Sequence, residues 1–126
     1  MSNYDLEEIK LLKWQFLLSS FFIISTLISL TLTYNEILKR KKQSPLYSPK
    51  EQVNVLRFNR VLASLIATCF IVINVIDKNV RKKYNDCDET VADLQICASM
   101  ITFIATLIVL YIAFSNSSDD IENPEL

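Results

Sequence analysis

Three cysteines have the widest chemical repertoire in this sequence, because a thiolate can bind metal, attack an electrophile or form a disulfide. They are Cys69, Cys87 and Cys97, and the 126-residue chain contains no histidine to join them. Their spacing matches no zinc-binding pattern, so we expect no metal site. A disulfide between Cys87 and Cys97 would require an oxidising compartment, and an odd number of cysteines in so short a chain favours free thiols.

The other groups that membrane enzymes use are also missing. An active site in a membrane needs a nucleophile with a base, a metal set or paired carboxylates where water can reach them. The chain has no glycine for a phosphate loop or an oxyanion turn, and its three long apolar stretches contain no acidic residue. We therefore expect neither enzymatic activity nor a cofactor. The absence of buried charge also argues against a proton-coupled transporter.

The remaining chemistry is hydrogen bonding and close contact between helices. Small and hydroxyl-bearing residues gather on about a third of the circumference of each apolar stretch, at 100° per residue. Such faces let transmembrane helices approach closely, although any single serine can instead bond to a carbonyl of its own helix. The predicted helix-packing residues are Ser19, Thr26, Ser29, Thr33, Ala63, Ala67, Ala98, Thr102, Ala105 and Thr106.

Two further sets of polar residues lie at the ends of apolar stretches. Asn59, Arg60 and Asn74 border the middle stretch, where we expect a polar helix contact or the lining of a pore. For Asn74, a solvated position at the end of the span is the alternative. The basic block beside the first stretch suits anionic lipid headgroups or an acidic partner surface. It consists of Lys39, Arg40, Lys41 and Lys42.

Three charge-free windows determine the predicted fold, and they cover 14–35, 61–76 and 94–118. Crossing about 30 Å of hydrocarbon takes about 20 apolar residues, which the first and third windows provide. They are apolar or hydroxyl-bearing on every side, whereas a surface helix of a soluble protein shows a polar side. The middle window spans only about 24 Å, so we expect Arg60 and Lys78 to reach outward from its ends. We predict an all-α integral membrane bundle of three transmembrane helices, about 14–35, 57–78 and 94–115.

Local signals place the start of the second helix. Ser48 fits the N-cap, Pro49 the first helical position, and Glu51 can reach back to the cap. No strong helix breaker follows until near Tyr84, so this helix should be about 50 Å long and extend beyond the bilayer. A second capping box is predicted to begin at Thr90.

Basic residues near the spans predict the topology. The first connection and the C-terminal tail share one side, with seven basic residues against six on the other. The dense block at 39–42 favours a cytoplasmic first connection, with the N-terminus outside and the C-terminus in the cytoplasm. The first stretch is longer than a signal-peptide core and should be retained. The plasma membrane of a prokaryote is the favoured location.

The sequence predicts one membrane domain over 1–118 and a flexible acidic tail over 119–126. The predicted function is a helix-packing interaction subunit that contacts lipid and binds its own copies or a membrane-protein partner, with no nucleic acid involved. The alternative is an oligomeric pore-forming or membrane-permeabilising protein of the holin-like or defence-effector type. The chain resembles holins in size and three-span layout alone, and its acidic tail departs from the basic tail common in them.

Overall fold

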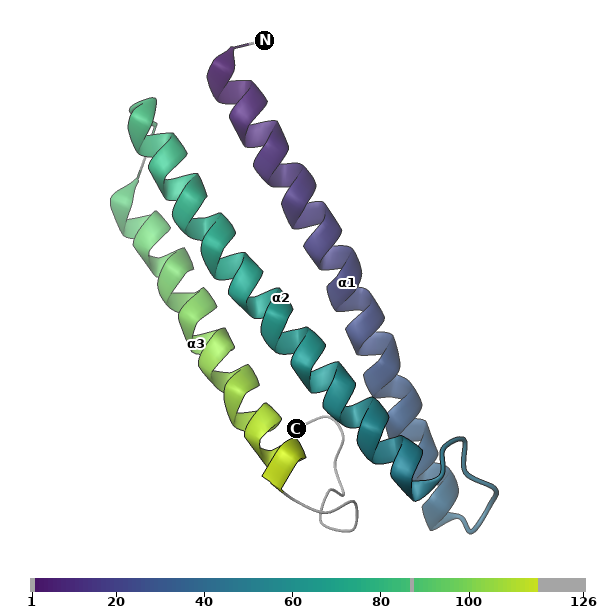
Figure 1. The fold of residues 1–126 in the computed structure, drawn as a ribbon. Helices are drawn as coiled ribbons and strands as arrows, with labels where there is room; N and C mark the ends of the chain where they lie inside the picture. The colour runs from purple at the N-terminus through teal and green to yellow at the C-terminus, as the bar shows by residue number, and fades with distance from the viewer. Residues whose placement is uncertain (1, 87, 116–126) are drawn as a thin grey trace.

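Three long helices make up the computed structural model, which describes residues 2–86 and 88–115. They are α1 (Asn3–Arg40), α2 (Pro49–Lys83) and α3 (Glu89–Ser115), and the described residues contain no strand. α2 lies between the other two helices, antiparallel to both, and packs against each of them (Figure 1). Each helix is long and apolar enough to cross a membrane. The predicted all-α fold with three membrane-spanning helices is confirmed.

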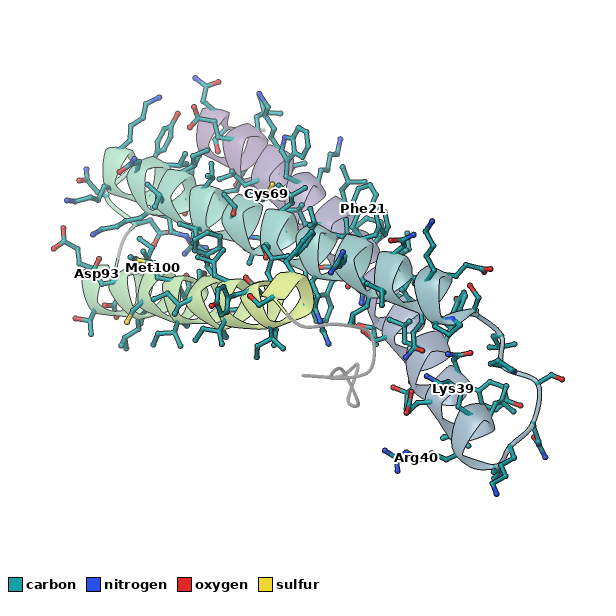
Figure 2. All side chains as sticks on the ribbon, turned by 60° about the horizontal axis from the view of Figure 1, so that its bottom comes forward. Phe21, Lys39, Arg40, Cys69, Asp93 and Met100 are labelled. Atoms are coloured by element: carbon teal, nitrogen blue, oxygen red, sulfur yellow. The ribbon has the colours of Figure 1, made fainter. Side chains whose placement is uncertain are left out.

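The helices are longer than a bilayer requires. α1 has 38 residues and α2 has 35, which correspond to about 57 Å and about 53 Å at 1.5 Å per residue. The hydrocarbon core is only about 30 Å thick, so both helices extend beyond it, as predicted. α3, with 27 residues, is about 40 Å long. Charged side chains gather toward the helix ends, for example Lys39 and Arg40 at one end and Asp93 at the other (Figure 2).

Side-chain caps start the second and third helices. The Ser48 hydroxyl accepts a hydrogen bond from the Glu51 amide at 3.2 Å and donates one to the Glu51 carboxylate at 3.1 Å, which confirms the predicted start of α2. α3 begins earlier than its predicted capping box. The Asp88 carboxylate accepts from the amides of Thr90 and Val91, so Asp88 performs the capping that was predicted for Thr90. The prediction was wrong because the helix begins at Glu89, so that the Asp88 carboxylate caps the amides of the first helical turn and Thr90 already lies inside the helix.

Both connections begin with a left-handed residue although the chain contains no glycine. Lys42 has φ 59° and Asn85 has φ 57°. The following residue, Gln43 or Asp86, donates its amide to a carbonyl five positions back, at 2.9 Å in each case. This is the Schellman pattern, which satisfies carbonyls that the helix end leaves without partners.

Hydrophobic contacts at two levels hold α2 in the middle of the structure. Toward the first connection, Leu32 of α1, Leu56 of α2 and Ala113 of α3 form a buried cluster. Toward the opposite end, Leu11 and Leu18 of α1 pack on Ile73 of α2. α3 contributes only Ala92 and Ala113 to the buried set among the described residues, so most of its surface remains available for lipid or another helix.

A polar cluster fastens the start of α1 to the end of α2, outside the apolar windows. The Tyr4 ring stacks on Tyr84 with centroids 5.1 Å apart, and its hydroxyl donates to Asp86 at 2.8 Å. Glu8 and Arg81 form an ion pair at 3.8 Å, and Arg81 also pairs with Asp77 of its own helix at 3.1 Å. This end of the α1–α2 contact therefore depends on electrostatics more than on apolar packing.

The pKa of Glu8 is raised to about 7, first because burial penalises its charged form and second because its carboxyl group hydrogen-bonds to Asp77 and lies near that negative charge. The positive charge of Arg81 lowers the pKa of Glu8 but does not cancel this increase. The folded chain thus keeps a proton on Glu8 that the unfolded chain releases above about pH 4.5. Its contribution to stability is full below this pH and is lost as the pH rises toward 7, because the unfolded state then binds fewer protons.

We expect Glu8→Gln to remove this pH dependence, because glutamine imitates the protonated side chain and does not ionise. Thermal unfolding in detergent should show a wild-type Tm that falls between about pH 4.5 and about pH 7, with a smaller fall in Glu8→Gln. Glu7→Gln is the matched control, since Glu7 pairs with Lys83 instead. Equal slopes in wild type and Glu8→Gln would contradict the assignment.

Candidate functional site

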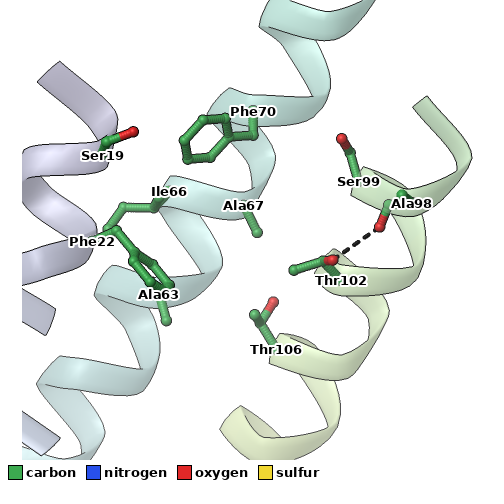
Figure 3. A pocket seen from close by; sticks show the side chains of 10 residues that line it. All are labelled: Ser19, Phe22, Ala63, Ile66, Ala67, Phe70, Ala98, Ser99, Thr102 and Thr106. Carbon is green, nitrogen blue, oxygen red and sulfur yellow. Dashed lines mark hydrogen bonds between the residues drawn. The ribbon is translucent and has the colours of Figure 1, made fainter. Parts of the chain in front are cut away.

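A groove with a volume of about 400 Å³ runs over α2 between α1 and α3 (Figure 3). It exists because α1 and α3 pack on different parts of α2 and, within the described residues, their backbones do not approach each other. We call it the small-residue groove. Its lining consists of Ser19, Phe22, Ala63, Ile66, Ala67, Phe70, Ala98, Ser99, Thr102 and Thr106.

Six of the ten predicted helix-packing residues converge on this groove. They come from all three helices, and they are Ser19, Ala63, Ala67, Ala98, Thr102 and Thr106. The sequence predicted a small-residue face for each helix separately. The structure shows that the three faces border the same groove. Their small volumes explain the hollow, because alanine, serine and threonine leave space beside the bulkier Phe22 and Phe70 (Figure 3).

The other four predicted packing residues lie elsewhere. Ser29 is buried at the α1–α2 contact, and Thr33 is half-buried. Thr26 is exposed and donates to the Phe22 carbonyl of its own helix at 3.0 Å. Ala105 is exposed on α3 and does not line the groove.

The hydroxyl groups that α3 contributes to the groove are satisfied within that helix. Thr102 donates to the Ala98 carbonyl at 2.9 Å, as Figure 3 shows, and Thr106 donates to Phe103 at 2.6 Å. Ser99 donates to Gln95 at 2.9 Å. These three hydroxyl groups therefore bond to carbonyls of their own helix. This is the alternative that the sequence left open beside contacts between helices. The groove therefore offers close approach rather than unpaired donors, which suits an apolar helix surface.

Asn59 forms the clearest polar contact between helices. Its Nδ2 atom donates to the Ser29 hydroxyl at 2.9 Å, and its Oδ1 atom accepts from Ser25 at 2.7 Å. The side chain is only 1% exposed. Asn59 is therefore a helix-packing residue in this structure, positioned away from solvent. Ser25 lies one helical turn before Ser29, and the sequence pattern places both on the same hydroxyl-bearing face of the first span.

The contact between Asn59 and α1 lies within the apolar part of the first span rather than at its end. Ser25 and Ser29 lie in the central part of the 14–35 window, so Asn59 faces the middle of the first span. The adjacent Arg60 is only 8% exposed. The outward reach of Arg60 from the end of the middle span stays a prediction.

Asn74 and Arg57 connect α2 to α3. The Asn74 amide donates to the Ser99 hydroxyl, so the interhelical bond, not the solvated alternative, describes this residue. Arg57 donates from Nε to the Ala113 carbonyl at 3.0 Å, and its guanidinium carbon lies 5.1 Å from the centroid of the Phe114 ring. The last turn of α3 contains no basic residue of its own. Arg57 thus supplies the positive charge that favours a helix C-terminus.

The basic block lies at the opposite end of α1 from the Tyr4 cluster. Lys39 donates to the Gln52 side chain at 3.0 Å, and Glu36 lies 3.6 Å from Lys39 and 3.8 Å from Arg40. Lys41 and Lys42 follow the helix and are exposed. Contact of this block with anionic lipid or an acidic partner stays a prediction.

Cys69 and Cys97 are exposed free thiols, and the described residues contain no cluster of three potential metal ligands. Residue 87 lies outside the described residues, and with it the alternative of a Cys87–Cys97 disulfide. The predicted acidic tail at 119–126 also lies outside them. Comparisons with models of protein families, with curated proteins and with solved structures found no match to this chain.

Proposed function

We propose that this small membrane protein is a helix-packing subunit of an oligomer, and that its small-residue groove receives a transmembrane helix from a neighbouring copy. The observation that carries the proposal is the convergence of six small residues from three helices on one unfilled groove. Lipid removes the hydrophobic driving force between helices, so association there depends on close backbone approach and van der Waals packing. The groove provides the space for that approach.

The outer face of α3 is the surface that we propose enters the groove of the next copy. Ile101, Ile104 and Ile108 recur at helical spacing and are more than half exposed. They lie on a different face of α3 from Ala98 and Thr102, as 100° per residue requires. A ridge that enters the groove of the next copy would give a head-to-tail contact, and such contacts close into rings or continue as filaments.

Ala98→Leu should reduce or abolish oligomer formation, because the larger side chain fills the groove. Ala98 is exposed, so the change leaves the contacts within one chain intact. Sedimentation in detergent would measure the oligomer mass, and circular dichroism would confirm that the helices remain. Thr26→Leu enlarges an exposed side chain of α1 outside the groove and away from the α3 ridge, and it should keep the wild-type mass. If Ala98→Leu also keeps it, the groove is not the docking surface.

An oligomeric pore is the alternative function, and the hydroxyl-bearing residues of the groove favour it. Ser19, Ser99, Thr102 and Thr106 would provide polar groups along a path enclosed by several copies. Purified oligomer should then release dye from liposomes, and Thr102→Val should slow the release without changing oligomer mass. If the purified oligomer releases no dye from liposomes, helix packing remains the proposed function. Neither proposal includes catalysis, and the prokaryotic location and cytoplasmic C-terminus remain predictions.

A further inference from the structure

A second groove follows the other side of the contact between α1 and α2. Its volume is about 500 Å³, and its rim carries Glu7, Lys10 and Trp14 from α1. At 100° per residue, its α2 residues lie on a different face of that helix from Ala63 and Ala67. It is thus separate from the small-residue groove. Its walls are apolar and include Leu11, Leu18, Val72, Ile73 and Ile76.

The depth of this second groove matches one leaflet of a bilayer. Along α2 it extends from Val80 at the rim to Thr68 and Cys69. Twelve residues of helix rise about 18 Å, whereas half of the hydrocarbon thickness is about 15 Å. Cys69 is exposed and lies on the side of α2 that faces α1 (Figure 2). An apolar chain that entered at the headgroup level would therefore reach Cys69.

The rim of the second groove carries positive charge without a partner. A smaller hollow of about 220 Å³ adjoins it, shares Lys10 and Trp14 with it, and adds Lys13. Among the described residues, no acidic side chain lies within ion-pair distance of Lys10 or Lys13. The negative charge of Glu7 is balanced by Lys83 at 3.5 Å. Trp14 suits the headgroup level, where its ring is half in water and half in hydrocarbon.

We propose that the second groove binds one anionic phospholipid, with its phosphate on Lys10 and Lys13 and an acyl chain along the apolar walls toward Cys69. The apolar length, the unpaired lysines and the interfacial tryptophan together specify this ligand class. The Glu7 Oε2 atom has no hydrogen-bond partner in the described structure and can accept from a headgroup hydroxyl. The site lies at the opposite end of α1 from the basic block at 39–42.

Alkylation of Cys69 in detergent tests the proposal. The full chain with Cys87→Ser and Cys97→Ser keeps one thiol, which lies at the inner end of the groove. Phosphatidylglycerol should slow the reaction of N-ethylmaleimide with Cys69, and its apparent affinity should be about 30-fold higher than that of phosphatidylcholine. This ratio corresponds to two lysines that each contribute about 1 kcal/mol near an anionic headgroup.

Charge variants separate this site from general attraction to anionic lipid. Lys10→Gln/Lys13→Gln should lose the preference for phosphatidylglycerol, whereas Lys41→Gln/Lys42→Gln should keep it because those lysines lie at the other end of α1. The proposal is overturned if phosphatidylcholine and phosphatidylethanolamine protect Cys69 as well as phosphatidylglycerol does. It is also overturned if the Lys10/Lys13 variant keeps the preference. Protection that rises with protein concentration without lipid would show that a second copy covers the groove.

Discussion

Asn59→Ala is expected to lower the free energy of unfolding in detergent micelles by about 1 to 3 kcal/mol. The change removes two hydrogen bonds between helices, those to Ser25 and Ser29, from a position that is 1% exposed. Individual bonds of this kind contribute about 0.6 kcal/mol on average and at most about 1.7 kcal/mol in membrane proteins. The lost side-chain volume adds a packing defect at the α1–α2 contact.

The measurement is reversible unfolding in mixed micelles, with circular dichroism as the signal. Asn54→Ala is the matched control, since Asn54 is an exposed asparagine of the same helix. A double-mutant cycle with Ser29→Ala separates the hydrogen bond from the packing defect, because the coupling energy isolates the pair. Additive effects of the two substitutions, or equal effects of Asn54→Ala and Asn59→Ala, would contradict a role of the Asn59 amide in joining the helices.

Arg57→Met is expected to loosen the C-terminal end of α3 and to destabilise the folded chain by about 2 kcal/mol. Arg57 bonds the Ala113 carbonyl at 3.0 Å and lies over the Phe114 ring. A hydrogen bond from a charged donor contributes about 1.5 to 3 kcal/mol, and a cation–π contact about 0.5 to 1 kcal/mol. Methionine keeps an unbranched apolar chain but offers neither interaction.

Hydrogen exchange with mass spectrometry would detect this effect locally. Peptides from the last turns of α3 should exchange faster in Arg57→Met, whereas those from the middle of α3 should change little. Lys50→Met removes a positive charge from an exposed position near the same end of α2 and should leave α3 unaffected. If both variants give the exchange pattern of the wild type, the bond to Ala113 does not hold the helix end.

Both residues belong to α2, and their contacts join it to the two flanking helices, Asn59 to α1 and Arg57 to α3. Asn59 faces the apolar window of α1, although along α2 it precedes that helix's own apolar window at 61–76. Buried polar groups need partners because an unsatisfied one costs free energy, and Ser25 and Ser29 provide them for Asn59. The middle helix is therefore the most polar of the three spans and is covered on two sides.

Sequence reasoning found the helices because their signals are local. Charge-free windows, the Ser48 cap and Pro49 each depend on residues within a few positions of one another. The same reasoning found the small-residue faces, since 100° per residue places their members on one side of a helix. It missed Asp88 as the cap of α3 and Arg57 as the partner of the α3 C-terminus. The contact of Arg57 could not be found from local patterns, because its partner Ala113 lies 56 positions away along the chain.

By itself, the sequence determined an all-α chain with three helices able to span a membrane, where the second helix starts, and which faces carry small residues. Only the tertiary structure decided that three of those faces border one groove, that Asn59 bonds to α1, and that Asn74 bonds to α3. Helix formation depends on residues close together along the chain. Register depends on side chains as far apart as Ser25 and Asn59, 34 positions, and many registers satisfy the same hydropathy pattern.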